Sequence, residues 1–168
     1  MSENVDLTDA TLANELGIGC LKMKRAHLWP LSHYFWESSA KQAIKQLRLK
    51  KRDDAKRILE KIEKEIEIIR GQKTLKKDQR IESATELGYL VGHVFCQGQN
   101  WEWCVVSAPK EVDSICICNA NRSLTIEPIA WIYKLLTKNV PVKCLLTYNM
   151  IDAGRLPPVR PNSYTRLN

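Results

Sequence analysis

Leu87-Gly-Tyr-Leu-Val-Gly92, inside the largely apolar segment from Arg80 to Gln97, is the stretch that decides how this chain folds. Apolar residues fill most positions of the segment, which predicts a helix that is buried on most of its sides. Gly88 and Gly92 are four residues apart and share one face, where a missing side chain lets another backbone approach closely. We expect this face to pack tightly on a sheet, and Gly98 to end the helix.

The residues after this helix predict a small antiparallel sheet. Residues 101–107 (WEWCVVS) alternate in the manner of a strand and contain bulky side chains, with Trp101, Trp103 and Val105 on one face. A turn at residues 109–113 leads to a second strand at residues 114–118 (SICIC), so the two strands form a hairpin. Residues 119–122 (NANR) are a loop tip, and residues 123–126 (SLTI) add a short third strand.

The last part of the chain adds a helix, a strand and a tail. Pro128 suits the first turn of a helix that runs to about Lys138, because its missing N–H costs nothing there. Residues 140–148 predict a further strand, and residues 154–168, with three prolines, an extended or mobile tail. The fold class is therefore α+β: a helical N-terminal half packed against an antiparallel sheet of three or four strands.

The N-terminal half is typical of amphipathic helices. Between Pro30 and Gly71 no helix breaker interrupts the chain, and one apolar stripe recurs at steps of three or four residues. The charged stretch at residues 50–54 interrupts this pattern, so we expect two helices or one bent helix, with Asp53 as cap of the second and Gly71 as its stop. A loop follows at residues 72–79. The stripe consists of Ile44, Leu47, Ala55, Ile58, Ile62, Ile66 and Ile69.

Length and composition indicate one folded domain. The chain has 168 residues, of which 44% are hydrophobic, enough to form a core and to argue against global disorder. We divide it into an N-terminal segment (1–29), a basic helical arm (30–71), an α+β core (80–150) and a proline-rich tail (151–168).

No apolar stretch approaches the ~20 residues of a membrane-spanning helix. The acidic start, residues 1–6, is unlike a secretory signal, so we expect a cytoplasmic protein whose six cysteines are reduced.

The net charge of +7 is concentrated in one segment. Residues 41–80 hold 15 basic and 7 acidic side chains, and the rest of the chain is close to neutral. One interpretation is a solvated helical face, and the other is a surface that attracts phosphates, anionic lipid or an acidic protein.

The second half resembles a group of small bacterial domains of unknown function. The resemblance covers residues 80–148 and rests on the Leu-Gly-x-x-x-Gly pattern at residues 87–92, the Trp-x-Trp pattern at residues 101–103, and residues 126–129 (IEPI) before an amphipathic helix. Such domains are similar in layout to immunity proteins of bacterial toxin systems, which are small and cytoplasmic. The resemblance implies a protein that acts by occluding a toxin.

Residues with catalytic or metal-binding chemistry form no recognisable motif. His93 with Cys96, and Cys116 with Cys118, are pairs on one helix and one strand, but they lack the knuckle spacing of a zinc site. We interpret the cysteines as core residues. The carboxylates are scattered, and phosphate-loop, dinucleotide and nucleophile-elbow motifs are missing from the sequence. We therefore expect no enzyme activity, no metal and no cofactor.

An aromatic cluster at residues 27–36 (HLWPLSHYFW) precedes the basic segment. Its aromatic side chains either fill the groove between the helical half and the sheet or form a hot spot for a partner. Combined with the basic segment, the cluster predicts a partner-binding site of eight residues: Trp29, Tyr34, Trp36, Lys50, Lys51, Arg52, Lys56 and Arg57.

The expected function is therefore binding of an acidic protein, a toxin or effector, by an immunity or adaptor protein. The alternative is nucleic-acid binding by the basic helices of residues 41–80. We expect no association with membranes, and the sequence leaves open whether the isoleucine stripe is buried within one chain or in a homodimer.

Overall fold

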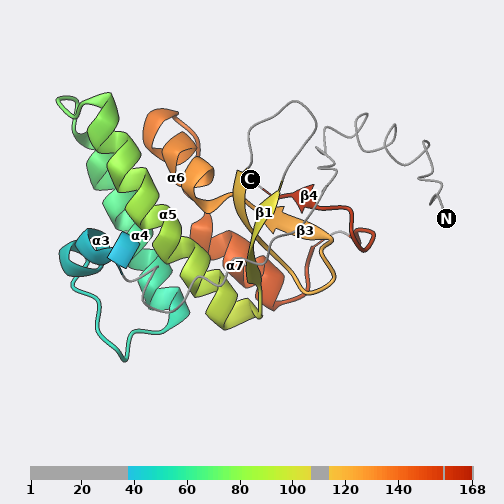
Figure 1. Cartoon of the computed structure of the whole chain (residues 1–168). Coiled ribbons are helices and arrows are strands. Elements are labelled where there is room, and N and C mark those ends of the chain that lie inside the picture. Colours follow the sequence, from blue (N-terminus) through green and yellow to red (C-terminus); the bar gives the residue numbers. More distant parts are fainter. Residues whose placement is uncertain (1–37, 107–113, 157, 168) are drawn as a thin grey trace.

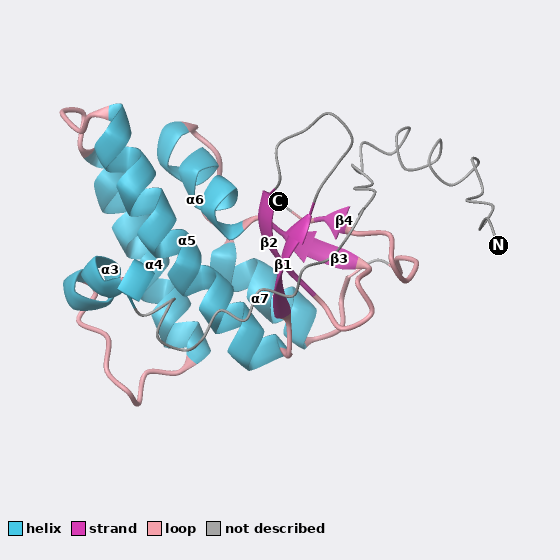
Figure 2. Cartoon of the chain, in the orientation of Figure 1, coloured by secondary structure: helices cyan, strands magenta, loops and turns pink. Residues whose placement is uncertain are grey.

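The computed structural model describes residues 38–106, 114–156 and 158–167. Its helices and strands form an α+β fold, as expected, with the sheet lying to one side of the helices (Figures 1 and 2). The helices are α3 (Lys41–Gln46), α4 (Ala55–Gly71), α5 (Lys77–Gln99), α6 (Pro128–Thr137) and α7 (Cys144–Asp152). The strands are β1 (Glu102–Val106), β2 (Ser114–Cys118), β3 (Leu124–Ile126) and β4 (Thr165–Arg166).

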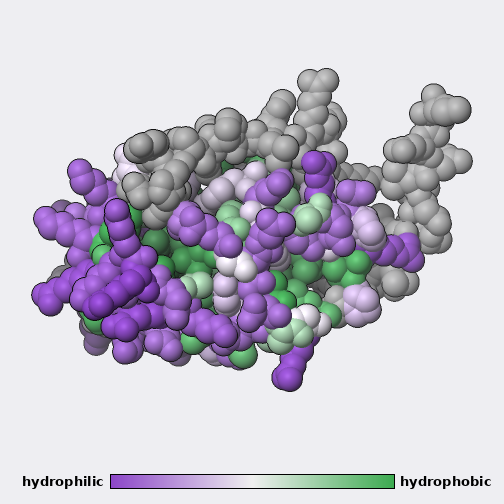
Figure 3. Space-filling model, turned by 90° about the horizontal axis from the view of Figure 1, so that it is seen from below, coloured by the Kyte–Doolittle hydropathy of each residue, from purple (hydrophilic) through white to green (hydrophobic). Residues whose placement is uncertain are grey.

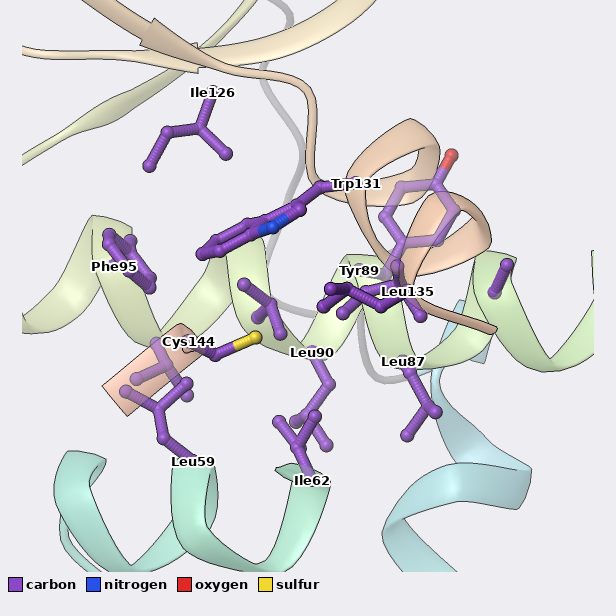
Figure 4. Close-up of a cluster of buried hydrophobic side chains, with 14 of the residues drawn as sticks. Leu59, Ile62, Leu87, Tyr89, Leu90, Phe95, Ile126, Trp131, Leu135 and Cys144 are labelled. Carbon is purple, nitrogen blue, oxygen red and sulfur yellow. The ribbon is translucent and has the colours of Figure 1, made fainter. Parts of the chain in front are cut away.

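Helix α5 is the centre of the hydrophobic core. Figure 4 shows side chains of α4, α6 and α7 converging on it, with the Trp131 ring above the helix. The Phe95 ring meets the rings of Trp131 and Tyr148 edge to face, at centroid distances of 6.4 and 5.3 Å. Such aromatic pairs add to the stability that burial already provides. The α5 residues that are buried are Ala84, Leu87, Gly88, Tyr89, Leu90, Val91, Gly92, Val94 and Phe95.

Both predicted glycines lie at close contacts, but only Gly92 packs on the sheet as expected, because Gly88 faces helix α6. A Cβ on Gly88 would lie 2.6 Å from the Cα of Ile129, the second residue of α6. A Cβ on Gly92 would lie 2.3 Å from the Trp103 ring on β1. Gly98 does not end the helix. It lies inside α5, against the Tyr148 hydroxyl, and the helix ends at Asn100, whose φ of 54° is left-handed.

The predicted hairpin and third strand are present. Strand β1 pairs antiparallel with β2, with Trp103 opposite Ile117, and β2 pairs antiparallel with β3. The turn predicted at residues 109–113 lies outside the described residues. The fourth strand differs from the expectation, because β4 comes from the tail and pairs parallel with β3, which makes the sheet mixed.

The strand predicted for residues 140–148 is wrong, because most of this segment forms helix α7. The valines at its start favoured a strand, but tertiary contacts favour the helix. The Glu63 carboxylate of α4 accepts a hydrogen bond from the Leu145 amide at 2.9 Å, in the first turn of α7, where helix N–H groups lack partners. Cys144 and Tyr148 of α7 are buried in the main core.

Within its described residues, the basic helical arm contains two helices, α3 and α4, as the break at residues 50–54 predicted. The cap of α4 is Asp54, one residue later than predicted, and its side chain accepts from the Arg57 amide at 2.8 Å. Gly71 is the last residue of α4. Four of the seven residues of the isoleucine stripe are buried within this chain, Ile62 and Ile66 fully, where α4 contacts α5, α6 and α7. The other three, Ile44, Ala55 and Ile58, are half-buried.

Candidate interaction surface

The connection from α3 to α4 carries three of the predicted partner-binding cations. Asp53 organises this loop: its carboxylate accepts from the Lys50 amide at 3.0 Å and from Lys61 Nζ at 2.8 Å. Lys61 Nζ also reaches the Arg48 carbonyl at 3.3 Å, so the loop is fastened to α4. The hydrogen bond from Lys61, with that from Lys50, lowers the pKa of the Asp53 carboxyl below its usual value. The loop backbone is therefore held in place and does not depend on a partner for its shape.

The predicted cations differ in how far other charges neutralise them. Lys56 pairs with Asp152 at 3.8 Å, and Arg57 Nε lies 3.4 Å from Asp53. The side chains of Lys50, Lys51 and Arg52 are exposed and form no ion pair with any other described residue. We call these three residues the basic loop. Because none of its three charges is paired with another residue that the structure describes, it is the part of the predicted site best able to attract an anionic partner.

A groove of about 670 Å³ lies beside the basic loop. Lys50 and Lys51 stand at its edge, while α3, α4 and α5 contribute its apolar walls. In Figure 3, which views the molecule from below, hydrophilic side chains crowd the end that carries α3 and α4, with hydrophobic surface exposed between them. The apolar lining residues are Ile44, Leu49, Ala55, Ile58, Leu90 and Val94, and the polar ones include Asp53, Asp54, His93 and Gln97. We call this hollow the loop groove.

Sequence reasoning missed the contribution of α5 to this surface. Leu90, His93 and Val94 line the loop groove, although the sequence separates them from the basic loop by about forty residues. The apolar pattern of α5 indicated burial on nearly every side, and it gave no signal that one edge borders a hollow. The predicted aromatic residues Trp29, Tyr34 and Trp36 lie outside the described residues.

The basic residues of 41–80 include two groups at opposite ends of α4. Lys73, Lys76 and Lys77 surround the connection from α4 to α5, and the basic loop lies at the opposite end of α4 (Figure 1). A helix of 17 residues is about 25 Å long at ~1.5 Å per residue, so the two groups are well separated. Arg70 and Arg80, near the far group, are used in folding: Arg80 binds the Leu136 carbonyl at 3.1 Å and the Gln72 carbonyl at 2.9 Å.

The described part of the chain contains no group of three or more His, Cys, Asp or Glu side chains arranged to hold a metal ion. His93 and Cys96, which the sequence places three residues apart on one helix, do not form a pair with an activated thiol, because burial raises the pKa of Cys96 to about 12. Burial raises the pKa of Cys116 to about 12 as well, with Glu127 adding to the shift.

Among the described helices, none combines the length and the apolar character that crossing a membrane requires.

No family model matches this chain, and neither a curated protein nor a solved structure is significantly similar to it.

Proposed function

We propose that this chain is a protein-binding protein of the immunity or adaptor kind, which occludes an acidic toxin or effector by docking it on the basic loop and the loop groove. One observation carries the proposal: Lys50 and Lys51, two exposed cations that form no ion pair with another described residue, stand at the edge of a groove with apolar walls. Protein interfaces combine an apolar anchor with a polar rim in this way.

The two parts of the surface have different roles in the proposal. The cations of the basic loop accelerate the encounter with a negatively charged partner and fix its orientation. An apolar side chain of the partner, seated among Leu49, Ile58 and Val94, slows dissociation, because leaving the groove exposes it to water again. Neither role requires a reacting group, so the proposed activity is non-enzymatic occlusion.

The loop groove suits a protein better than a nucleic acid. Its walls offer aliphatic side chains rather than the aromatic platforms on which bases stack.

The test compares two charge reversals of equal size. The first variant carries Lys50→Glu, Lys51→Glu and Arg52→Glu, and the control carries Lys73→Glu, Lys76→Glu and Lys77→Glu at the other end of α4. A partner captured by the intact chain is identified, purified and titrated against both variants at two salt concentrations. We expect the loop variant to bind at least about tenfold more weakly, mainly through slower association, and the control to bind like the original chain.

Two results would overturn the proposal. Equal binding by the two variants would show that the basic loop is not the docking site. Recovery of nucleic acid as the sole ligand, with affinity that both variants lose and that falls steeply with salt, would favour the nucleic-acid alternative.

A further inference from the structure

Two arginines meet where α4 turns into α5 and where α6 ends, at one end of the helices (Figure 1). Arg80 Nη1 donates to the Ile69 carbonyl at 3.4 Å, so its guanidinium group lies against the turn of α4 that carries Arg70. The same nitrogen donates to the Leu136 carbonyl of α6 at 3.1 Å. Arg70 reaches the end of α6 as well, because its Nη2 donates to the Asn139 side-chain oxygen at 3.0 Å. Both guanidinium groups therefore join α4 to α6 at the same corner of the fold.

These contacts use only part of the hydrogen-bonding capacity of the two side chains. A guanidinium group has five N–H donors. Arg80 donates three hydrogen bonds, all to backbone carbonyls. Arg70 also donates three, to the Glu67 carboxylate, the Val140 carbonyl and the Asn139 side chain. Five donors less three leaves two N–H groups on each arginine that form no hydrogen bond with a described residue.

A hollow of about 440 Å³ lies at this corner, and we call it the arginine hollow. The residues that line it are Arg70, Arg80, Leu136, Thr137, Lys138 and Asn139. Three of them are cations and none is a carboxylate. Arg70 has an anionic partner outside this lining, the exposed Glu67 at 3.1 Å. Arg80 and Lys138 form no ion pair with any residue that the structure describes. Positive charge at the arginine hollow therefore exceeds the negative charge of the side chains that reach it.

We propose that the arginine hollow binds the phosphate group of a small molecule. The planar fork of a guanidinium group matches two oxygens of a phosphate, and a hydrogen bond to an anionic oxygen is stronger than one to a neutral oxygen. Arg70 and Arg80 each have two N–H groups left to donate, and Lys138 adds an exposed ammonium. A volume of about 440 Å³ is within the range of about 300–1,000 Å³ that is typical of sites for small ligands.

The carbonyls around the two arginines act in two ways. They hold the guanidinium groups in place before a ligand arrives, which reduces the side-chain freedom that binding would cost. They also oppose an anion, because the carboxyl ends of α4 and α6 carry about half a negative charge each. Together with Glu67, these ends offset about two of the three positive charges, so about one remains to attract a phosphate. The arginine hollow lies at the opposite end of α4 from the basic loop, and the inference does not depend on the proposed function.

The experiment titrates the isotope-labelled full chain with inorganic phosphate and with phenyl phosphate, and follows the binding by two-dimensional NMR. Sodium chloride keeps the ionic strength constant, so that screening does not change during the titration. We expect both probes to shift the Nε–H signals of Arg70 and Arg80 and the backbone amide signals of Lys138 and Asn139 along one saturable curve. Tighter binding of phenyl phosphate would identify a phosphate ester as the ligand, and tighter binding of inorganic phosphate would identify the free ion.

Three variants test which side chains hold the phosphate. Arg80→Lys keeps the charge but loses the fork, and we expect it to weaken binding about tenfold or more. Lys138→Gln changes an exposed side chain that the fold does not need, so it tests the site even if Arg80→Lys fails to fold, and we expect it to weaken binding several-fold. Lys45→Gln is the matched control, because Lys45 is an exposed lysine of α3 that does not line the arginine hollow. We expect it to bind within about twofold of the original chain.

The absence of a saturable shift at the arginine hollow with either probe would refute the inference. An equal loss of affinity in Lys138→Gln and Lys45→Gln would also refute it, since that result indicates diffuse attraction by the net charge of the chain. Shifts caused by a single-stranded oligonucleotide, without shifts caused by either small phosphate, would replace the small-molecule site with a nucleic-acid contact.

Discussion

Replacing Gly88 with alanine tests whether α5 and α6 touch through their backbones. The added Cβ would lie 2.6 Å from Ile129 Cα and 2.8 Å from Ile129 N, and these atoms move only if α6 moves. Overpacking costs typically 1–3 kcal/mol, and the obstruction by backbone puts this site near the upper limit, at about 3 kcal/mol. Alanine favours the helical state by about 1 kcal/mol over glycine. The net loss is therefore about 2 kcal/mol, or about 4–8 °C in the melting temperature.

Gly71→Ala is the matched control, because it makes the same change in the last residue of α4, where a Cβ meets no atom within 4 Å. Thermal and urea unfolding of the two variants and of the original chain give the comparison. We expect Gly71→Ala to leave stability unchanged or slightly raised and Gly88→Ala to lower it. If Gly88→Ala is as stable as the control, the contact between α5 and α6 is looser than the structure shows, and the reasoning is refuted.

Two further predictions concern charged residues in the helical half. Glu65 is buried beside Gln46, whose amide hydrogen-bonds its carboxylate, and burial raises its pKa above the usual value of 4.5. Because the pKa of Glu65 is higher in the folded chain than in the unfolded chain, Glu65 contributes fully to stability below about pH 4.5. This contribution is lost as the pH rises through the pKa of the folded state. Glu65→Gln should therefore raise the melting temperature at pH 7 relative to the original chain, with a difference that disappears in acid; an equal effect at both pH values would contradict this reason. Arg80→Met removes the hydrogen bonds to the carbonyls of Leu136, Gln72 and Ile69. We expect it to lower the free energy of unfolding in urea by about 1–3 kcal/mol, and Arg80→Lys to lower it by less. The control Lys77→Met, at an exposed position, should change it by no more than about 0.5 kcal/mol. A loss as large for Lys77→Met would show that charge alone, rather than these bonds, is responsible.

The error at residues 140–148 shows where prediction from the sequence stopped. Val140, Pro141 and Val142 favour extended backbone and do precede α7 without helical structure. The following residues become helical because Glu63 binds the first turn and Tyr148 packs against Gly98 and Phe95. These partners come from α4 and α5, which no local pattern at residues 140–148 could reveal.

The candidate surface was predicted in part for a similar reason. The positions of Lys50, Lys51 and Arg52 outside the helices followed from the break in the apolar pattern, since three charges in succession cannot continue a buried stripe. The loop groove beside them was not predictable, because its walls come from three helices that meet through long-range packing.

The sequence by itself determined the helices α4, α5 and α6, the hairpin of β1 and β2, and the close packing at Gly92 on the sheet. Apolar spacing, proline and glycine act over a few residues, so their effects can be read locally. Only the tertiary structure decided that the tail supplies a parallel strand, that residues 144–152 are helical and that the basic loop borders an apolar groove. Each of these outcomes depends on contacts between residues far apart in the chain, and the energy of such contacts exceeds the weak local preference that they override.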